Sequence, residues 1–241
     1  KYFLLIILFT FINSVAQEFL SSVKLDSLFY EYVAIKTGEK SIETHFHTGG
    51  EDDHIPSKCG FYIVNEVRRN FDLFTLEQQK QLKILFQRPD RQTSFVTPSG
   101  YFRVHYNSTG SDVPGYNLQD LAIALDSTYN FHINYLGYPV PPHDNGAGGD
   151  NLYDVYLVSL GAGLYGYTEF EPVNSGDVKG PSFMVIDNSF ATQFTKGIDG
   201  ARVTVAHEFH HAIQLGSYIY RPSDVFFYEI TSTAMEKFVY E

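Results

Sequence analysis

The sequence is poor in residues that cross-link a chain and in residues that carry positive charge. It has one cysteine, Cys59, and no tryptophan. One cysteine cannot form a disulfide within the chain, so the fold must rest on its packed core. Only 17 Lys and Arg stand against 28 Asp and Glu, which gives a formal net charge of −11. This balance argues against nucleic acid or an anionic membrane as a partner, because both require basic patches.

Long apolar runs are absent after the first residues, so we expect no stable membrane anchor in this segment. The one run, Tyr2–Ile12, follows Lys1 and precedes the small residues Ser14-Val15-Ala16. That order predicts a signal peptide over residues 1–16, cleaved before Gln17, and therefore a secreted protein. The chain begins without Met and ends inside an expected helix, so we expect it to be truncated, at its C-terminus in particular.

The composition is that of a globular protein, with 44% hydrophobic residues and many Tyr and Phe. Residues 17–90 predict a mainly helical N-terminal region, and residues 91–241 predict a domain of strands and helices, so the fold class is α+β. The expected helices are Gln17–Lys36, Phe61–Phe71, one beginning at Thr75, Leu118–Tyr135, Gly200–Leu215 and Ser223–Tyr240. The expected strands are Phe102–Tyr106, Tyr153–Leu160, Tyr165–Glu171 and Ser182–Asp187.

One segment carries a strong metal-binding pattern. Residues 207–211 read H-E-x-x-H, and residues four apart lie on one face of a helix. His207 and His211 can therefore offer two imidazoles to one zinc ion, with Glu208 placed to act on a water as general base. Val205, Phe209, Ala212 and Ile213 fall on the opposite, apolar face. His210 lies off the ligand face and is left out of the metal set.

A third ligand is expected from the following helix. The positions where a third histidine would follow a metzincin motif hold other residues, which leaves a carboxylate as the alternative. Glu229, Thr233 and Glu236 share one face of the expected helix. Phe227, Ile230, Ala234 and Phe238 form an apolar stripe on the other face, which we expect to be packed. Two antiparallel helices, each with an apolar face behind and a polar face in front, can form a three-ligand site.

These two helices resemble those of gluzincin-type, thermolysin-like zinc metallopeptidases, and more closely a group of exported bacterial metallopeptidases. The matching patterns are V-A-H-E-F-x-H-A-x-Q at residues 205–214 and E-x-x-[AS]-T-x-x-E at residues 229–236. The resemblance implies a zincin-like domain, His207, His211 and Glu229 as ligands of one Zn²⁺, and a catalytic Glu208. It departs from thermolysin at Thr233, which stands where that pattern has Asp, so the residue behind the ligands is left open. Thr233 is one candidate, and Glu236 is either a second candidate or a plain surface carboxylate.

The implied activity is that of a secreted endopeptidase acting on proteins or peptides. Two alternatives stay open: a non-catalytic secreted binding domain with a structural zinc, and a zinc hydrolase of non-peptide substrates. Residues 181–187 are either the edge strand that receives the substrate or an ordinary sheet strand. The loop Asp144–Asp150 is either a calcium site or a flexible loop. The sequence leaves the oligomeric state open.

Cys59 needs an explanation because it is the only cysteine of a chain expected to be secreted. Pro56-Ser57-Lys58-Cys59-Gly60 resembles the P-R-C-G segment with which matrix metallopeptidase zymogens cap their zinc. The resemblance implies that the region up to about residue 90 is a propeptide and that Cys59 is an inhibitory zinc ligand. The alternative is a small buried residue that packs the N-terminal region against the rest.

Overall fold

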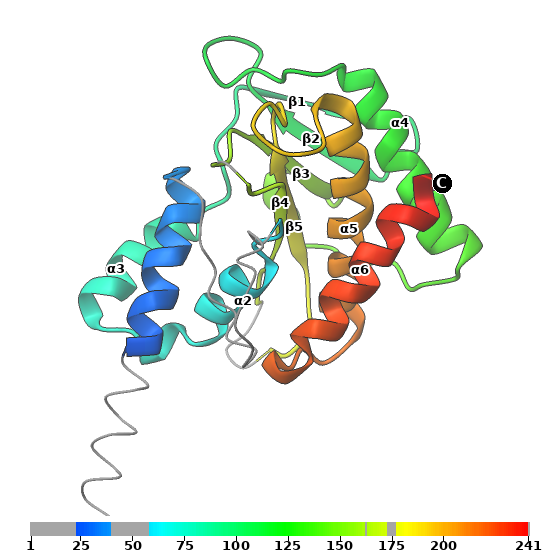
Figure 1. Ribbon diagram of the computed structural model, residues 1–241. Coiled ribbons are helices and arrows are strands. Elements are labelled where there is room, and N and C mark those ends of the chain that lie inside the picture. The colour runs from blue at the N-terminus through cyan, green and yellow to red at the C-terminus, as the bar shows by residue number, and fades with distance from the viewer. Residues whose placement is uncertain (1–22, 40–57, 162, 173–176, 241) are drawn as a thin grey trace, which may run out of the picture.

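Five strands form one mixed sheet at the centre of the structure (Figure 1). The computed structural model describes residues 23–39, 58–161, 163–172 and 177–240, so the predicted signal peptide lies outside the described residues. The strand order is β1-β2-β3-β5-β4; β2, β3 and β5 are parallel, and β1 and β4 are antiparallel to their neighbours. The strands are β1 Thr93–Val96, β2 Phe102–Tyr106, β3 Tyr153–Val158, β4 Gly166–Phe170 and β5 Ser182–Asp187. The predicted α+β class is confirmed.

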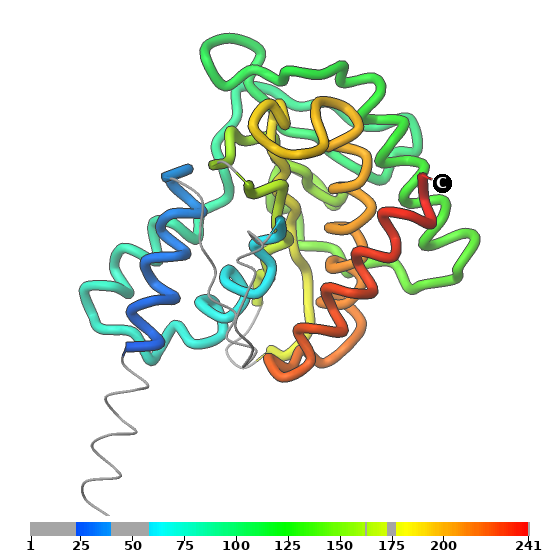
Figure 2. Tube along the Cα trace, in the orientation of Figure 1, coloured from blue at the N-terminus to red at the C-terminus, as the bar shows by residue number. Residues whose placement is uncertain are grey.

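Helices cover both faces of this sheet, as Figures 1 and 2 show. On one side lie α4 Leu118–Tyr129, α5 Gly197–Ser217 and α6 Val225–Tyr240, with α6 packed on α5. On the other side lie a helix over residues 23–37, α2 Phe61–Arg69 and α3 Leu76–Leu85. Thr75 caps α3 by a reciprocal pair of hydrogen bonds with Gln78, as its sequence predicts. Within the described ranges, no helix is long and apolar enough to cross a membrane.

Two apolar clusters hold these layers together. One lies between the sheet and helices α4 and α5, and it contains Val155 of β3 and Phe209 of α5. The other lies on the opposite face and joins Val185 of β5 to Tyr32 of the first helix and Val64 of α2. Helices of the predicted N-terminal region therefore share a core with the sheet, so this region and the sheet are expected to unfold cooperatively.

Strand β5, residues Ser182–Asp187, is an interior strand between β3 and β4, so of the two alternatives for residues 181–187 the ordinary sheet strand holds; the edge strands are β1 and β4. One expectation about packing is wrong. The apolar stripe of α6 is not packed: Phe227, Ile230 and Phe238 are 65%, 51% and 60% exposed. The buried side chains of the helix are Ser232 and Met235 instead. The periodicity of the sequence thus distinguishes two faces of α6 but does not indicate which face packs against α5.

A buried carboxylate joins the N-terminal region to the edge strand. Glu169 of β4 has a fully buried side chain, which accepts from Lys36 Nζ at 2.7 Å, Arg68 Nε at 2.8 Å and the Tyr32 hydroxyl at 2.8 Å. Burial acts to raise the pKa of Glu169, but Lys36 and Arg68 outweigh it, and the pKa is lowered. The carboxylate is thus held ionised, because two cations from two helices surround it.

Glu169→Gln is expected to lower the free energy of unfolding by about 3–5 kcal/mol, because it leaves two buried cations without their counter-charge. Denaturant unfolding should show a lower midpoint with an unchanged slope. Glu77→Gln is the matched control, since Glu77 pairs with Lys80 at 3.3 Å on the surface with both side chains more than 70% exposed. That control should move the free energy by less than about 1 kcal/mol. Equal midpoints for both variants would contradict the anchoring role.

Candidate metal centre

Helix α5 presents two imidazoles on the face that looks away from the sheet. Val205, Phe209 and Ile213 are fully buried in the core between α5 and the sheet, as the helical spacing predicts. His207 and His211 therefore point to the other side, toward α6, with their Nε2 atoms 3.0 Å apart. Two imidazole nitrogens at this separation need a shared proton or a cation between them, because their lone pairs otherwise repel each other.

Helix α6 brings Glu229 to the same point. Its two carboxylate oxygens lie 3.3 Å from His207 Nε2 and 3.5 Å from His211 Nε2. Cys59, from the segment before α2, completes the group: one donor atom from each of the four residues lies within 4.8 Å of all the others. No other group of three or more metal-ligand side chains occurs in the part of the chain that the structure describes. The buried group Cys59, His207, His211 and Glu229 can therefore hold a metal ion.

A hydrogen bond at Nδ1 orients each of the two imidazoles. His207 Nδ1 donates to Glu236 Oε1 at 2.8 Å, and His211 Nδ1 donates to Gln214 Oε1 at 2.7 Å. Gln214 is fixed in turn by donating from Nε2 to Thr231 Oγ1 at 2.9 Å. Because each Nδ1 is occupied, each Nε2 is left to face the centre, which is the arrangement that metal-ligating histidines require. Glu236 thus takes the position behind a ligand, and Gln214 is a partner that the sequence analysis missed.

The N-terminal region supplies a wall of the site as well as Cys59. Phe61, the first residue of α2, stacks on the imidazole of His211 with ring centroids 3.8 Å apart and planes 8° from parallel. Phe61 itself is fully buried. The stacked ring restricts rotation of His211 and excludes water from one side of it. Nothing in the local pattern around Phe61 indicates this contact, because it joins segments 150 positions apart in the chain.

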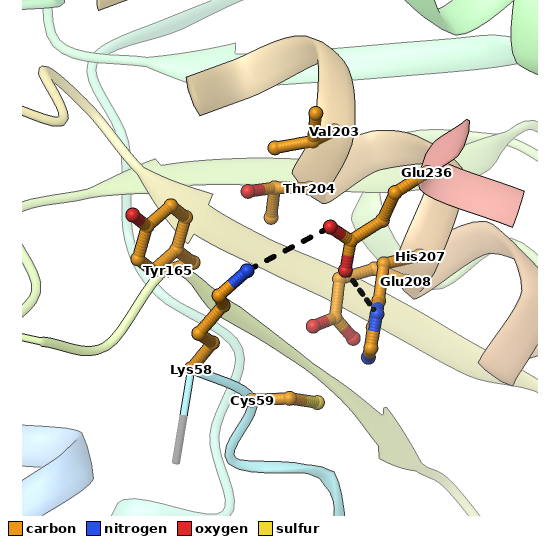
Figure 3. A pocket seen from close by; sticks show the side chains of 8 residues that line it. All are labelled: Lys58, Cys59, Tyr165, Val203, Thr204, His207, Glu208 and Glu236. Carbon is orange, nitrogen blue, oxygen red and sulfur yellow. Dashed lines mark hydrogen bonds and ion pairs between the residues drawn. The ribbon is translucent and has the colours of Figure 1, made fainter. Parts of the chain in front are cut away.

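Glu208 lies beside the four donors without belonging to them. It is 1% exposed, and the Thr168 hydroxyl of β4 donates to its Oε2 at 2.8 Å. Burial raises the pKa of Glu208, and the neighbouring His207 and His211 oppose that rise. Figure 3 shows Glu208 next to His207 in a pocket that Cys59 also lines. A buried carboxylate with a raised pKa is a stronger base than a solvated one.

The charges of the site favour a cation at its centre. Burial acts to lower the pKa of His207, but its hydrogen bonds to Glu229 and Glu236 raise it to about 10. Burial would raise the pKa of Glu229, yet the imidazoles of His211 and His207 lower it. Burial raises the pKa of Cys59, and the carboxylates of Glu208 and Glu229 raise it further. The side chains of Cys59, Glu208 and Glu229, which are anionic when deprotonated, thus lie close to the two imidazoles. A divalent cation would balance these charges.

Three comparisons with known proteins found no match. No protein-family model, no curated protein and no solved structure matches it. Function is therefore inferred from the chemistry of the site itself.

The remaining predicted site residues lie outside the four donors. Thr233 is exposed on α6, so the structure gives the position behind the ligands to Glu236. In the loop Asp144–Asp150, both terminal carboxylates face arginines: Asp144 pairs with Arg88 at 2.7 Å, and Asp150 accepts from Arg103 Nε at 3.1 Å. These ion pairs favour a structural loop over the calcium alternative.

His210 is buried against a second histidine and not against the donors. Its ring lies 5.5 Å from that of His132, in the π-helical segment Asn130–Tyr135 that continues α4. His132 is fully buried and its Nδ1 donates to the Thr128 carbonyl at 2.9 Å. Burial lowers the pKa of His132 to about 4 and that of His210 to about 3, so both are neutral at ordinary pH.

His132 should make the fold sensitive to acid. Its folded-state pKa lies below its ordinary value of 6.5, so between pH 6.5 and about 4 the unfolded chain binds the extra proton and the folded chain does not. The stabilisation is complete above pH 6.5 and is lost as the pH falls, by up to about 1.4 kcal/mol per pH unit. His132→Asn removes this titration and retains a side-chain N–H donor. The free energy of unfolding of the variant should fall less steeply with acid, and parallel pH profiles would contradict the assignment.

Proposed function

We propose that the protein is a secreted zinc-dependent endopeptidase of the gluzincin type, with His207, His211 and Glu229 as ligands and Glu208 as general base. The observation that carries the proposal is the convergence of these three donors, from two helices, beside a buried carboxylate that is not among them. Two imidazoles, a carboxylate and a thiol are a donor set that suits zinc. Glu236 and Gln214 behind the imidazoles supply the outer contacts that a metal site needs.

The arrangement of elements supports a zincin-like domain as part of this proposal. Helix α5 crosses one face of the sheet, and the edge strand β4 lies beside the donors, since Thr168 of β4 reaches Glu208. Gly166 makes this approach close: a Cβ at that position would lie 2.9 Å from Thr204 Cγ2 and 3.3 Å from Glu208 Cγ, both on α5. Strand and helix are therefore spaced so that Glu208 lies beside β4, in a pocket that Cys59 and His207 also line.

Each side chain of the site then has its own role in peptide hydrolysis. When bound, a zinc ion would act as a Lewis acid, which lowers the pKa of a water molecule and polarises the scissile carbonyl. Glu208 accepts the proton of the attacking water on its carboxylate and delivers it to the leaving nitrogen. The Thr168 hydroxyl holds Glu208 Oε2 in place, and burial makes the carboxylate more basic. Glu236 and Gln214 keep both imidazole Nε2 atoms directed at the centre.

Zinc content and zinc-dependent cleavage test the proposal together. The purified protein should bind one zinc per chain, and a chelator should remove both the zinc and any cleavage of a peptide library, with zinc restoring both. The assay should include the wild type and Cys59→Ser, because Cys59 is one of the four convergent donors. Absence of zinc binding, or zinc binding without cleavage by either protein, would contradict the proposal.

One observation favours a second candidate, a non-catalytic domain with a structural zinc. Structural zinc sites have four protein ligands, and four donors converge here when Cys59 is counted. Such a domain would keep its zinc and its stability in every variant of Glu208, and it would cleave nothing. A buried carboxylate that binds no metal has no purpose in a structural site and is costly to bury, which is why the catalytic function is preferred.

A further inference from the structure

The segment before α2 lies along the outer edge of β4 as an added strand. Lys58 O accepts from Tyr165 N at 2.8 Å, and Gly60 N donates to Gly166 O at 2.9 Å. These two bonds make Cys59 and Gly166 a parallel bridge partner pair. Gly60 fits closely, since a Cβ there would lie 3.2 Å from both Ile35 Cδ1 and Tyr167 Cβ. The backbone of residues 58–60 is therefore held against the strand that borders the metal centre.

The rest of this edge is covered by one side chain of α2. Asn65 Nδ2 donates to Thr168 O at 2.9 Å, and Asn65 Oδ1 accepts from Phe170 N at 2.9 Å. The carboxamide of Asn65 thus does what the peptide group of a neighbouring strand would do, and Asn65 is fully buried. An extended peptide that binds a sheet by strand addition uses the free edge groups of the outer strand. At Gly166 O, Thr168 O and Phe170 N, this chain itself engages such groups.

The same segment delivers a sulfur atom to the metal centre. Cys59 is 7% exposed, and its Sγ belongs to the set of four donor atoms within 4.8 Å of one another. Zinc in a catalytic site uses three protein ligands and keeps its fourth position for water or substrate. A thiolate in the fourth position excludes both. The backbone of residues 58–60 therefore lies on the edge of β4, and the side chain of Cys59 lies at the fourth position of the metal. A peptide substrate needs both of these places.

We propose that Lys58-Cys59-Gly60 is an intramolecular inhibitor: Cys59 is the fourth zinc ligand, the segment holds the edge of β4, and the described form is latent. This inference rests on the proposed function. Coordination of Cys59 releases the thiol proton to solvent and forms a zinc–sulfur bond. Opening breaks that bond, returns a proton to the sulfur and lets water enter. Glu208 is then ready beside the vacated position.

Cobalt substitution tests the inference without relying on activity. The wild-type protein loaded with Co²⁺ should show sulfur-to-cobalt charge-transfer absorption in the near ultraviolet. Cys59→Ser and Cys59→Ala should lose this absorption. Both variants should keep the visible cobalt bands of a site held by His207, His211 and Glu229. The single cysteine makes thiol labelling unambiguous. Iodoacetamide should modify the zinc-loaded protein more slowly than the metal-free protein.

Peptide cleavage provides the second measurement. Cys59→Ser and Cys59→Ala should cleave peptides at least about tenfold faster than the wild type, because the open state becomes the major one. Thermal unfolding of each variant checks that it folds. Cobalt binding without the sulfur band overturns the inference and leaves the proposed function standing. The sulfur band without faster cleavage in either folded variant makes Cys59 a permanent ligand and overturns latency. Failure to bind cobalt or zinc overturns the proposed function itself.

Discussion

In a Cys59→Ser background, Glu208→Gln is expected to bind zinc as before and to hydrolyse peptides about 10²–10⁴-fold more slowly. The amide has the size and shape of the carboxylate, and its oxygen can still accept from the Thr168 hydroxyl that now holds Glu208 Oε2 at 2.8 Å. It cannot accept the proton of the attacking water. The change therefore removes the base and leaves the surroundings of the site intact.

The measurement pairs zinc stoichiometry with initial rates on one peptide that the Cys59→Ser protein cleaves. Both proteins should hold one zinc per chain and should unfold at similar temperatures. Thr168→Val is an informative companion, because it removes the donor to Glu208 and keeps the carboxylate, so a smaller loss is expected. Near-normal rates for Glu208→Gln would show that another group accepts the proton, and the assignment of the base would fail.

Glu229→Ala is expected to weaken zinc binding by more than the roughly 10–100-fold typical of losing a group behind a ligand. Its carboxylate oxygens lie 3.3 and 3.5 Å from the two imidazole Nε2 atoms, so they converge with them on one point. Removing the carboxylate takes away a ligand and a negative charge together. The affinity is measured by competition with a chromophoric chelator at fixed pH.

Glu236→Gln is the matched control for this loss. Glu236 lies on the same helix and contacts the same imidazole as Glu229, but at Nδ1 and not at Nε2. The glutamine oxygen can still accept from His207 Nδ1, so the loss should stay within about the 10–100-fold range. If Glu229→Ala and Glu236→Gln weakened zinc binding equally, the third ligand would have to be sought elsewhere, with Glu236 as the first alternative.

The local features of the site could be predicted because they depend on short spacings. The i, i+4 repeat places His207 and His211 on one side of α5, and the alternation of Phe102–Tyr106 gives β2 with the observed bounds. Gln214 follows His211 by three positions, so the same helical rule could have found it. Periodicity tells which residues share a face of a helix or strand. It therefore predicts a contact correctly when both partners lie close together on the same face.

The remaining features depend on which elements meet, and periodicity does not contain that information. The sequence does not indicate that β5 is flanked by β4, so it leaves open whether residues 181–187 form an edge strand or an interior strand. Phe61 and Thr168 reach the site from segments 150 and 40 positions away from their partners, His211 and Glu208. For α6, two faces were recognised but the wrong one was expected to be packed, because Ser232 and not the phenylalanines meets α5.

The buried contacts of Glu169 constrain how such a protein could mature. Lys36 of the first helix and Arg68 of α2 both neutralise this carboxylate, and the same helices pack on one face of the sheet at β3, β4 and β5. Dissociation of residues 23–86 after a cut would expose that apolar face to water and separate the Glu169 carboxylate from its two cations, which is unfavourable. A processed molecule would therefore stay a two-chain complex, joined without any covalent bond. On the proposed function, activation would consist of a local release of the segment at Cys59, while the rest of the N-terminal region stays in place as a permanent part of the folded protein.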